Sequence, residues 1–341
     1  MNIKTSLAAL AILPSLAFAQ LKIVTTTTDY ADLARQIGGD KVVAYSVMRG
    51  PENVHNVLAT PAEMVQLNAA DLFVHSGLDA EPWRDNLIKG ARNPRILPDR
   101  PGNVDMSTGV PLKDAPQGKV DRSMGDVHAY GNPHYTLNPQ IGQRMTVTLL
   151  KAMVANDPAN ADFYKVNAKK LVLDLAELGR EIRAEFAPYA GLKVVTFHKA
   201  WGYFADAVPI EITDTIEQQV MITPSPRQVR QVIERMRAAG VKVVVCETWD
   251  DQNLAQFVAG EAGAKMVVLP NQVKGVPAAN SYQELFRYNV RRLIETARAA
   301  GVDPRPAAAA DTQSASPAGA AVPKVSGTDG GDTASGNYGG R

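Results

Sequence analysis

The chain has 341 residues, of which 45% are hydrophobic, and its 36 basic residues almost balance its 35 acidic ones. This composition is typical of a globular protein, and the near-zero charge gives no electrostatic reason to expect nucleic acid as a partner. The single cysteine excludes an internal disulfide and a cysteine zinc cluster, so a transition-metal site must use mainly carboxylates and the five histidines.

The chain begins with the pattern of a secretory signal peptide over residues 1–19. A basic residue precedes an apolar stretch over residues 7–18, and Ala17-Phe18-Ala19 is a small-x-small cleavage site. The stretch is too short to span a bilayer well, and no cysteine follows it that could carry a lipid. We therefore expect a mature chain that starts near Gln20 and works outside the cytoplasm.

Strand and helix patterns alternate through the first half of the chain. A capping box formed by Thr60 and Glu63 marks the start of one helix. Such alternation is typical of a parallel sheet covered by helices. The expected elements are strand 21–25, helix 29–37, strand 42–47, helix 61–69 and strand 72–75.

One long helix is predicted over residues 160–186, because five apolar residues recur there at spacings of three and four. At about 1.5 Å per residue this helix would be about 40 Å long, enough to link two lobes rigidly. The residues of its apolar face are Leu171, Leu175, Leu178, Ile182 and Phe186.

The second half repeats the alternation and ends in a tail of different composition. Residues 304–341 contain no Leu, Ile, Phe or Trp, so they cannot bury enough apolar surface to fold, and we expect a disordered tail. The expected elements before it are strand 192–197, helix 226–239, strand 241–246, helix 253–262, strand 266–269 and helix 282–300.

Three histidines lie in loops or at the ends of predicted elements. His55 and His134 lie in loops, and His198 directly follows an apolar strand, as Glu247 follows another. Ligand sites in open α/β sheets lie beyond the carboxyl ends of strands. Three imidazoles and one carboxylate are a set that suits tetrahedral Zn²⁺, whereas Mn²⁺ prefers more oxygen ligands. The wide spacing of these residues makes this only a weak signal by itself.

Larger segments of the chain carry a resemblance to a known family. They are the opening KIVTTTTDYADLARQIGGDKV, the loop GPENVHNVLATPAEMVQLNAADLFVHSGLDAEPW, the loop DVHAYGNPHYTLNP, the segment VVTFHKAWGYFAD and the final SYQELFRYNVRRL. Over residues 21–301 the chain resembles the metal-binding solute receptors of bacterial zinc/manganese ABC importers, the cluster A-I or helical-backbone type. The form GDVHxxGNPHY marks a subgroup.

The resemblance implies an α/β fold of two Rossmann-like lobes with parallel sheets, joined by one long backbone helix, with metal bound in the cleft between the lobes. The expected organisation is a signal peptide at 1–19, an N-terminal lobe at 20–155, a connecting helix at 156–188, a C-terminal lobe at 189–303 and a tail at 304–341. The implied function is a periplasmic receptor that delivers zinc to an ABC permease in the inner membrane. Mn²⁺ and Fe²⁺ stay open as cargo, and we expect a monomer without enzymatic activity.

Carried over by position, His55, His134 and His198 match the three histidine ligands of that family. The fourth ligand departs from the pattern, since Pro270 or Asn271 stands where many relatives have an aspartate. Glu247, at the end of a strand and expected to be ionised at neutral pH, is the candidate for that position.

Water or His128 are the alternatives for the fourth position. His75 is expected to be structural, and Glu217 could orient a liganding imidazole. Residues 110–127 hold no histidine, so the His/Asp-rich loop of many zinc receptors is missing.

Two other classes of protein stay open at this point. A secreted zinc hydrolase would need three protein ligands, an open water position and a general base, which Glu247 could supply. A metal-binding adhesin or metallochaperone could use the same scaffold, because a fold does not fix a function. In a receptor, we expect affinity to fall below about pH 6 as imidazoles protonate.

Overall fold

The computed structural model describes residues 20–116, 128–218 and 222–305. The predicted signal peptide lies outside the described residues, as does the predicted tail except for Pro304 and Arg305. Among the described helices, none is long and apolar enough to cross a membrane.

The N-terminal lobe is built on four parallel strands in the order β2-β1-β3-β4. Helix α2 begins with the predicted capping box of Thr60 and Glu63. The strands are β1 Leu21–Thr25, β2 Val42–Ser46, β3 Leu72–His75 and β4 Asn103–Asp105, and the helices between them are α1 Thr28–Gly38, α2 Pro61–Asn68 and α3 Arg84–Ala91.

The C-terminal lobe repeats this arrangement, with four parallel strands in the order β6-β5-β7-β8. The first strands of the two sheets, LKIVT and LKVVT, also share one burial pattern. The strands are β5 Leu192–Thr196, β6 Ile210–Thr215, β7 Val243–Cys246 and β8 Lys265–Val268, and the helices are α6 Gly202–Ala207, α7 Pro226–Ala239, α8 Gln252–Ala262 and α9 Tyr282–Ala299.

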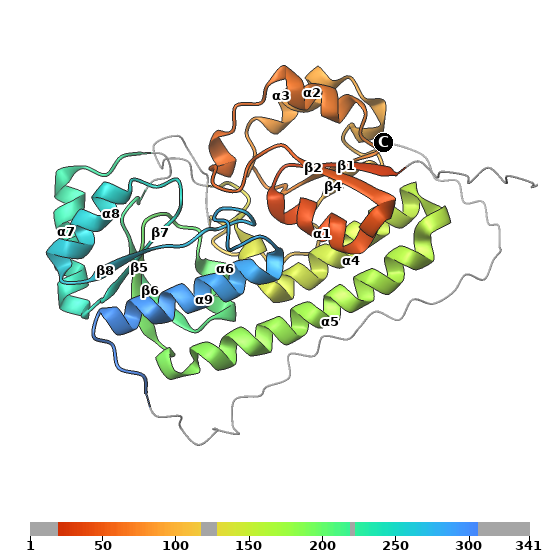
Figure 1. Cartoon of the computed structure of the whole chain (residues 1–341). Helices are drawn as coiled ribbons and strands as arrows, with labels where there is room; N and C mark the ends of the chain where they lie inside the picture. The colour runs from red at the N-terminus through yellow and green to blue at the C-terminus, as the bar shows by residue number, and fades with distance from the viewer. Residues whose placement is uncertain (1–19, 117–127, 219–221, 306–341) are drawn as a thin grey trace, which may run out of the picture. The chain divides into compact units, whose positions relative to one another are not determined.

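One long helix joins the lobes. Helix α4 (Pro139–Asn156) leads into α5 (Ala161–Phe186), which runs past both sheets (Figure 1). The buried residues of α5 include all five of the predicted apolar face. The predicted fold class is therefore confirmed: two parallel four-stranded sheets are joined by a long helix.

Alternate residues of the central strands face two different cores, as expected for sheets covered on both sides. Ile23 of β1 and Val194 of β5 belong to one large cluster that also includes the buried face of α5. The next residue of each strand belongs to a separate outer cluster. Val24 packs in a cluster with residues of α2 and α3, and Val195 packs in a cluster with residues of α7 and α8. Cys246 lies buried in the outer cluster of the C-terminal lobe.

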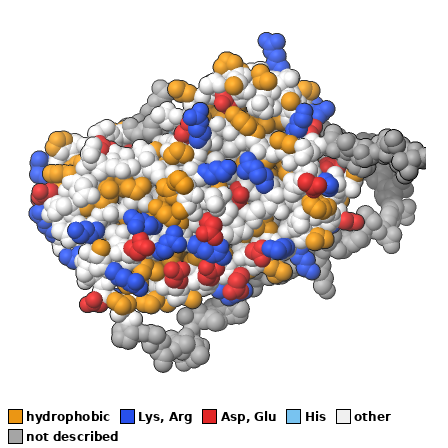
Figure 2. Space-filling model, in the orientation of Figure 1, with side chains coloured by type: hydrophobic (Ala, Val, Ile, Leu, Met, Phe, Trp, Pro, Cys, Tyr) orange, Lys and Arg blue, Asp and Glu red, His pale blue; other side chains and the backbone are white. Residues whose placement is uncertain are grey.

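Charged side chains of both signs cover the face formed by α5 and α9 (Figure 2). Arg287 of α9 bonds to both oxygens of Glu181 of α5, with Nε and Nη2 at 2.8 and 2.9 Å. This bidentate contact fixes the C-terminal helix against the connecting helix, in addition to their shared apolar core.

The apolar face of α5 should contribute strongly to stability. Leu178 is fully buried in the large cluster, so Leu178→Ala should lower the free energy of unfolding by about 2–5 kcal/mol. Leu173, on the same helix, is 60% exposed and is the matched control. Its replacement by alanine should change the stability by less than about 1 kcal/mol. Urea unfolding measures both; equal effects would contradict the packing described here.

Candidate metal centre

Three buried imidazoles converge between the two lobes. The Nε2 atom of His134 lies 3.4 Å from Nε2 of His55 and 3.3 Å from Nε2 of His198. Within the part of the chain that the structure describes, these three residues form the group suited to hold a metal ion, with one ligand atom from each within 4.8 Å of the others. The three predicted histidines are thus brought together across 143 residues of sequence.

The spacing of these nitrogens corresponds to a tetrahedral zinc site. Zinc binds imidazole nitrogen at about 2.0–2.1 Å, so two nitrogens at tetrahedral positions stand about 3.3–3.4 Å apart. The two measured Nε2 separations have these values. His134 is therefore placed to share such an ion with each of the other two imidazoles.

His55 and His134 are positioned by the same local device. His55 lies in the short 3-10 helix η2 (Val54–Asn56), and His134 precedes η5 (Tyr135–Leu137). In each case an asparagine two residues earlier accepts the backbone N–H of the histidine, as in an Asx turn: Asn53 at 2.9 Å and Asn132 at 3.0 Å. The pattern Asn-x-His precedes both loop ligands and is a local signal visible in the sequence.

His198 comes from the other lobe, directly after β5. Its Nδ1 lies 3.5 Å from Oε1 of Glu217, the residue predicted to orient an imidazole. Asn132 also links the lobes here, because its Nδ2 donates to the carbonyl oxygen of Lys199 at 3.2 Å. The loop that carries His134 is thereby held next to the strand end that carries His198.

Burial keeps the first two imidazoles neutral. The Nδ1 of His55 lies 3.0 Å from the carbonyl oxygen of Ala80. A carbonyl only accepts, so Nδ1 carries the proton and Nε2 presents its lone pair to the site. Burial, together with the nearby rings of His128 and His198, lowers the pKa of His55 to about 3. Burial likewise lowers the pKa of His134 well below its ordinary value. Neutral imidazole is the form that binds metal.

Glu247 lies fully buried after β7, and it is not a member of the three-histidine group. Trp201 Nε1 donates to its Oε1 at 2.7 Å. Burial and the neighbouring Asp250 raise the pKa of the Glu247 carboxyl well above its ordinary value, which favours the protonated acid rather than the carboxylate expected from the sequence.

The two remaining histidines have different surroundings. His75 is the last residue of β3. Its Nε2 lies 2.8 Å from Oδ1 of Asn103, and its Nδ1 accepts a hydrogen bond from the N–H of Gly77 at 3.1 Å. His128 lies beside the centre, with its ring centroid 4.8 Å from that of His55. Its partner is Asp79, which sequence reasoning missed.

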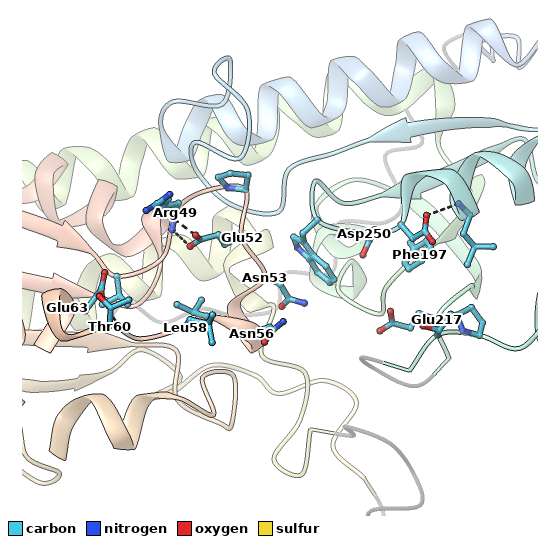
Figure 3. A pocket seen from close by; sticks show the side chains of 18 residues that line it. Arg49, Glu52, Asn53, Asn56, Leu58, Thr60, Glu63, Phe197, Glu217 and Asp250 are labelled. Atoms are coloured by element: carbon cyan, nitrogen blue, oxygen red, sulfur yellow. Dashed lines mark hydrogen bonds and ion pairs between the residues drawn. The ribbon is translucent and has the colours of Figure 1, made fainter. Parts of the chain in front are cut away.

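A cleft of about 680 Å³ opens next to the centre. Its lining from the N-terminal lobe includes Asn53 and Asn56, and its lining from the C-terminal lobe includes Phe197, Glu217 and Trp249. Asn53 and Asn56, which flank His55 in the sequence, lie opposite Glu217 across it (Figure 3).

Known proteins share both this fold and this sequence pattern. Residues 23–296 match the family model described as zinc-uptake complex component A, periplasmic. The match to a crystal structure of the protein ZnuA covers 80% of this chain and 97% of the ZnuA chain, with 23% identity and a TM-score of 0.65. A manganese-bound periplasmic metal-binding protein from Candidatus Liberibacter asiaticus covers 81% of this chain and 99% of its own, with 19% identity and a TM-score of 0.66.

Curated relatives have similar coverage. A putative metal-binding protein of Treponema pallidum is 27% identical over 80% of this chain and 86% of its own length. The iron-binding protein YfeA of Yersinia pestis is 28% identical over 74% of this chain and 77% of its own length. The manganese ABC transporter substrate-binding lipoprotein of Streptococcus pneumoniae is 24% identical over 81% of this chain and 88% of its own length. With a buried three-histidine centre between two α/β lobes and a family match over most of its length, the chain belongs to the family of periplasmic A components of zinc-uptake complexes, which bind metal for ABC import.

Proposed function

We propose that this protein is a periplasmic receptor that binds Zn²⁺ through His55, His134 and His198 and delivers it to an ABC permease in the inner membrane. The observation that carries this proposal is the distance of His134 Nε2 from Nε2 of His55 and from Nε2 of His198, since both distances suit tetrahedral zinc. The family is one of solute-binding receptors rather than enzymes.

Zinc is favoured over manganese and iron by the donor atoms of the centre. Some relatives are named for manganese or iron, so membership of the wider group does not select the ion. Here the group of potential ligands consists of three imidazoles and contains no carboxylate. Imidazole nitrogen suits zinc, whereas manganese prefers oxygen. Glu247 stays the sequence-based prediction for the fourth ligand, with one oxygen already bonded to Trp201.

Metal binding would couple the two lobes. His55 and His134 belong to the N-terminal lobe and His198 to the C-terminal lobe, so one ion bonded to all three stabilises the closed arrangement. That stabilisation equals the difference in affinity between the closed and open forms. A permease that recognises the closed form would then select the loaded receptor. We expect the receptor to act as a monomer after the predicted signal peptide is removed.

The test is the metal content and metal preference of the native protein. Protein purified from its native compartment should carry about one zinc per chain by elemental analysis. In competition titrations with a chelator of known affinity, zinc should bind at least roughly a hundredfold more tightly than manganese. Stoichiometric manganese, or equal affinities, would refute zinc as the cargo and leave the family membership intact.

A further inference from the structure

A fourth imidazole, that of His128, lies beside the metal centre and outside the three-histidine group. Its ring centroid lies 4.8 Å from that of His55 and 6.1 Å from that of His134. Its Nδ1 lies 3.0 Å from Oδ1 of Asp79. Its Nε2 is buried and has no hydrogen-bond partner among the described residues.

The contact with Asp79 leaves the metal-binding nitrogen of His128 free. An ionised carboxylate only accepts, so Nδ1 carries the proton and Nε2 carries the lone pair. A carboxylate that holds an imidazole in this way is the usual outer partner of a histidine ligand, since it fixes the ring and makes it more basic. Ala80, the next residue along the chain, does the same for His55 through its carbonyl oxygen. Two consecutive residues thus orient two imidazoles of one centre.

The turn that carries Asp79 adopts backbone angles that cost energy. Gly77, Leu78 and Asp79 have φ values of 66°, 55° and 140°, and the last two are not glycine. Residues such as Leu78 and Asp79 rarely adopt these conformations, which persist where the surroundings impose them. The Oδ2 of Asp79 also accepts the N–H of Ala129 at 2.9 Å. The strained turn therefore fixes both the ring of His128 and the backbone beside it.

The ring of His128 lies close to the centre, but its nitrogens fall outside the group of ligand atoms within 4.8 Å of one another, so this ring must move to bind the same ion. A ring bound to zinc through Nε2 has its centroid about 3.2 Å from the ion, so four rings at tetrahedral positions have centroids about 5.2 Å apart. The centroid of His134 lies 5.2 Å from those of both His55 and His198. The centroid of His128 lies 4.8 Å from that of His55, which is shorter than this spacing, and 6.1 Å from that of His134, which is longer.

We infer that His128 supplies the fourth ligand, so that zinc is bound by four imidazoles with Asp79 as the positioning residue for His128. This inference rests on the proposed function. It replaces Glu247 at the fourth position, because Oε1 of Glu247 is bonded to Trp201, whereas the His128 ring lies 4.8 Å from that of His55 with its Nε2 unpartnered among the described residues. Four nitrogen donors and no oxygen donor would also strengthen the preference for zinc over manganese.

X-ray absorption of the full chain loaded with one equivalent of zinc tests this inference directly. The wild-type spectrum should show four imidazole nitrogens at about 2.0 Å, and that of His128→Ala should show three. Glu247→Gln should leave the count at four. Three imidazoles in the wild type, or an unchanged count in His128→Ala, would overturn the inference.

Affinity measurements give a second and independent readout. His128→Ala should lower zinc affinity at least roughly tenfold, and Asp79→Asn should lower it by a smaller factor through the weaker hold on the ring. His75→Ala, a buried histidine outside the centre, is the matched control and should keep wild-type affinity. If His198→Ala loses affinity and His128→Ala does not, only this inference fails. If the wild type binds no zinc, the proposed function fails with it.

Discussion

Replacement of His134 by alanine should weaken zinc binding at least roughly a hundredfold, more than any other single histidine substitution. The Nε2 of His134 lies 3.4 Å from Nε2 of His55 and 3.3 Å from Nε2 of His198. Alanine at this position would therefore remove the imidazole that lies next to both of the others. Loss of an outer partner of a ligand typically costs ten- to a hundredfold in affinity, and loss of a ligand costs at least as much. A competition titration with a chelator measures the change.

The fold should survive this substitution. The His134 side chain contacts imidazoles, while Asn132 holds the loop through the backbone of residue 134, which alanine keeps. His75→Ala is again the control, since His75 lies at the end of β3 with partners of its own. A His134→Ala protein that unfolds cooperatively like the wild type and yet binds zinc with unchanged affinity would exclude His134 as a ligand.

Acid should destabilise the metal-free protein through His55. The folded pKa of His55 is about 3, because burial disfavours the charged ring, whereas an unfolded histidine titrates near about 6.5. Between these values the unfolded state binds a proton that the folded state does not, so stability is fully present above about pH 6.5 and falls as the pH drops towards 3. The free energy of unfolding falls by about 1.4 kcal/mol per pH unit in this range, which amounts to a loss of about 2 kcal/mol by pH 5.

His55→Gln isolates this contribution, because all other titrating groups are common to both proteins. Urea unfolding in the presence of a chelator, at pH 7.5 and pH 5, should show that the wild type loses about 2 kcal/mol more than the variant. Equal losses would mean that the folded protein protonates His55 as readily as the unfolded chain does.

The same burial changes the expected pH dependence of zinc binding. From ordinary imidazole pKa values, the sequence predicts a loss of affinity below about pH 6. The lowered pKa values of His55 and His134 mean that these imidazoles stay neutral below that pH in the folded protein. Affinity should therefore persist to lower pH, until the fold itself is destabilised.

Strongly periodic or capped segments were predictable from the sequence. The apolar face of α5, the capping box of Thr60 and Glu63, and the bounds of β3 are all as predicted. Local patterns decide these features, so a single segment carries the information. His198 was placed correctly for a related reason, since the end of an apolar strand marks the ligand side of a parallel sheet.

Helix α4 was not predicted, because its buried face is not a plain apolar stripe. Gly142 and Thr146 lie on it. A Cβ at Gly142 would stand 2.7 Å from the ring of Tyr282, so this position needs a residue without a side chain at a contact with α9. Strand β6 is a half-buried edge strand, and β4 has three residues, so both carry weak patterns.

The outer partners of the histidines were the least predictable part of the centre. The carbonyl oxygen of Ala80 leaves no mark in the sequence, because every residue has one. Asp79 reaches His128 through a turn with positive φ at Leu78 and at Asp79 itself, and leucine rarely adopts such a conformation. Such contacts follow from the packing of distant segments and appear only in three dimensions.

The most direct test of the proposed centre is anomalous diffraction at the zinc absorption edge from crystals of the protein loaded with one equivalent of zinc. We predict one strong peak between the lobes, about 2.0–2.1 Å from Nε2 of His55, His134 and His198. A zinc peak elsewhere in the chain, with these three nitrogens unbound, would contradict the proposed function.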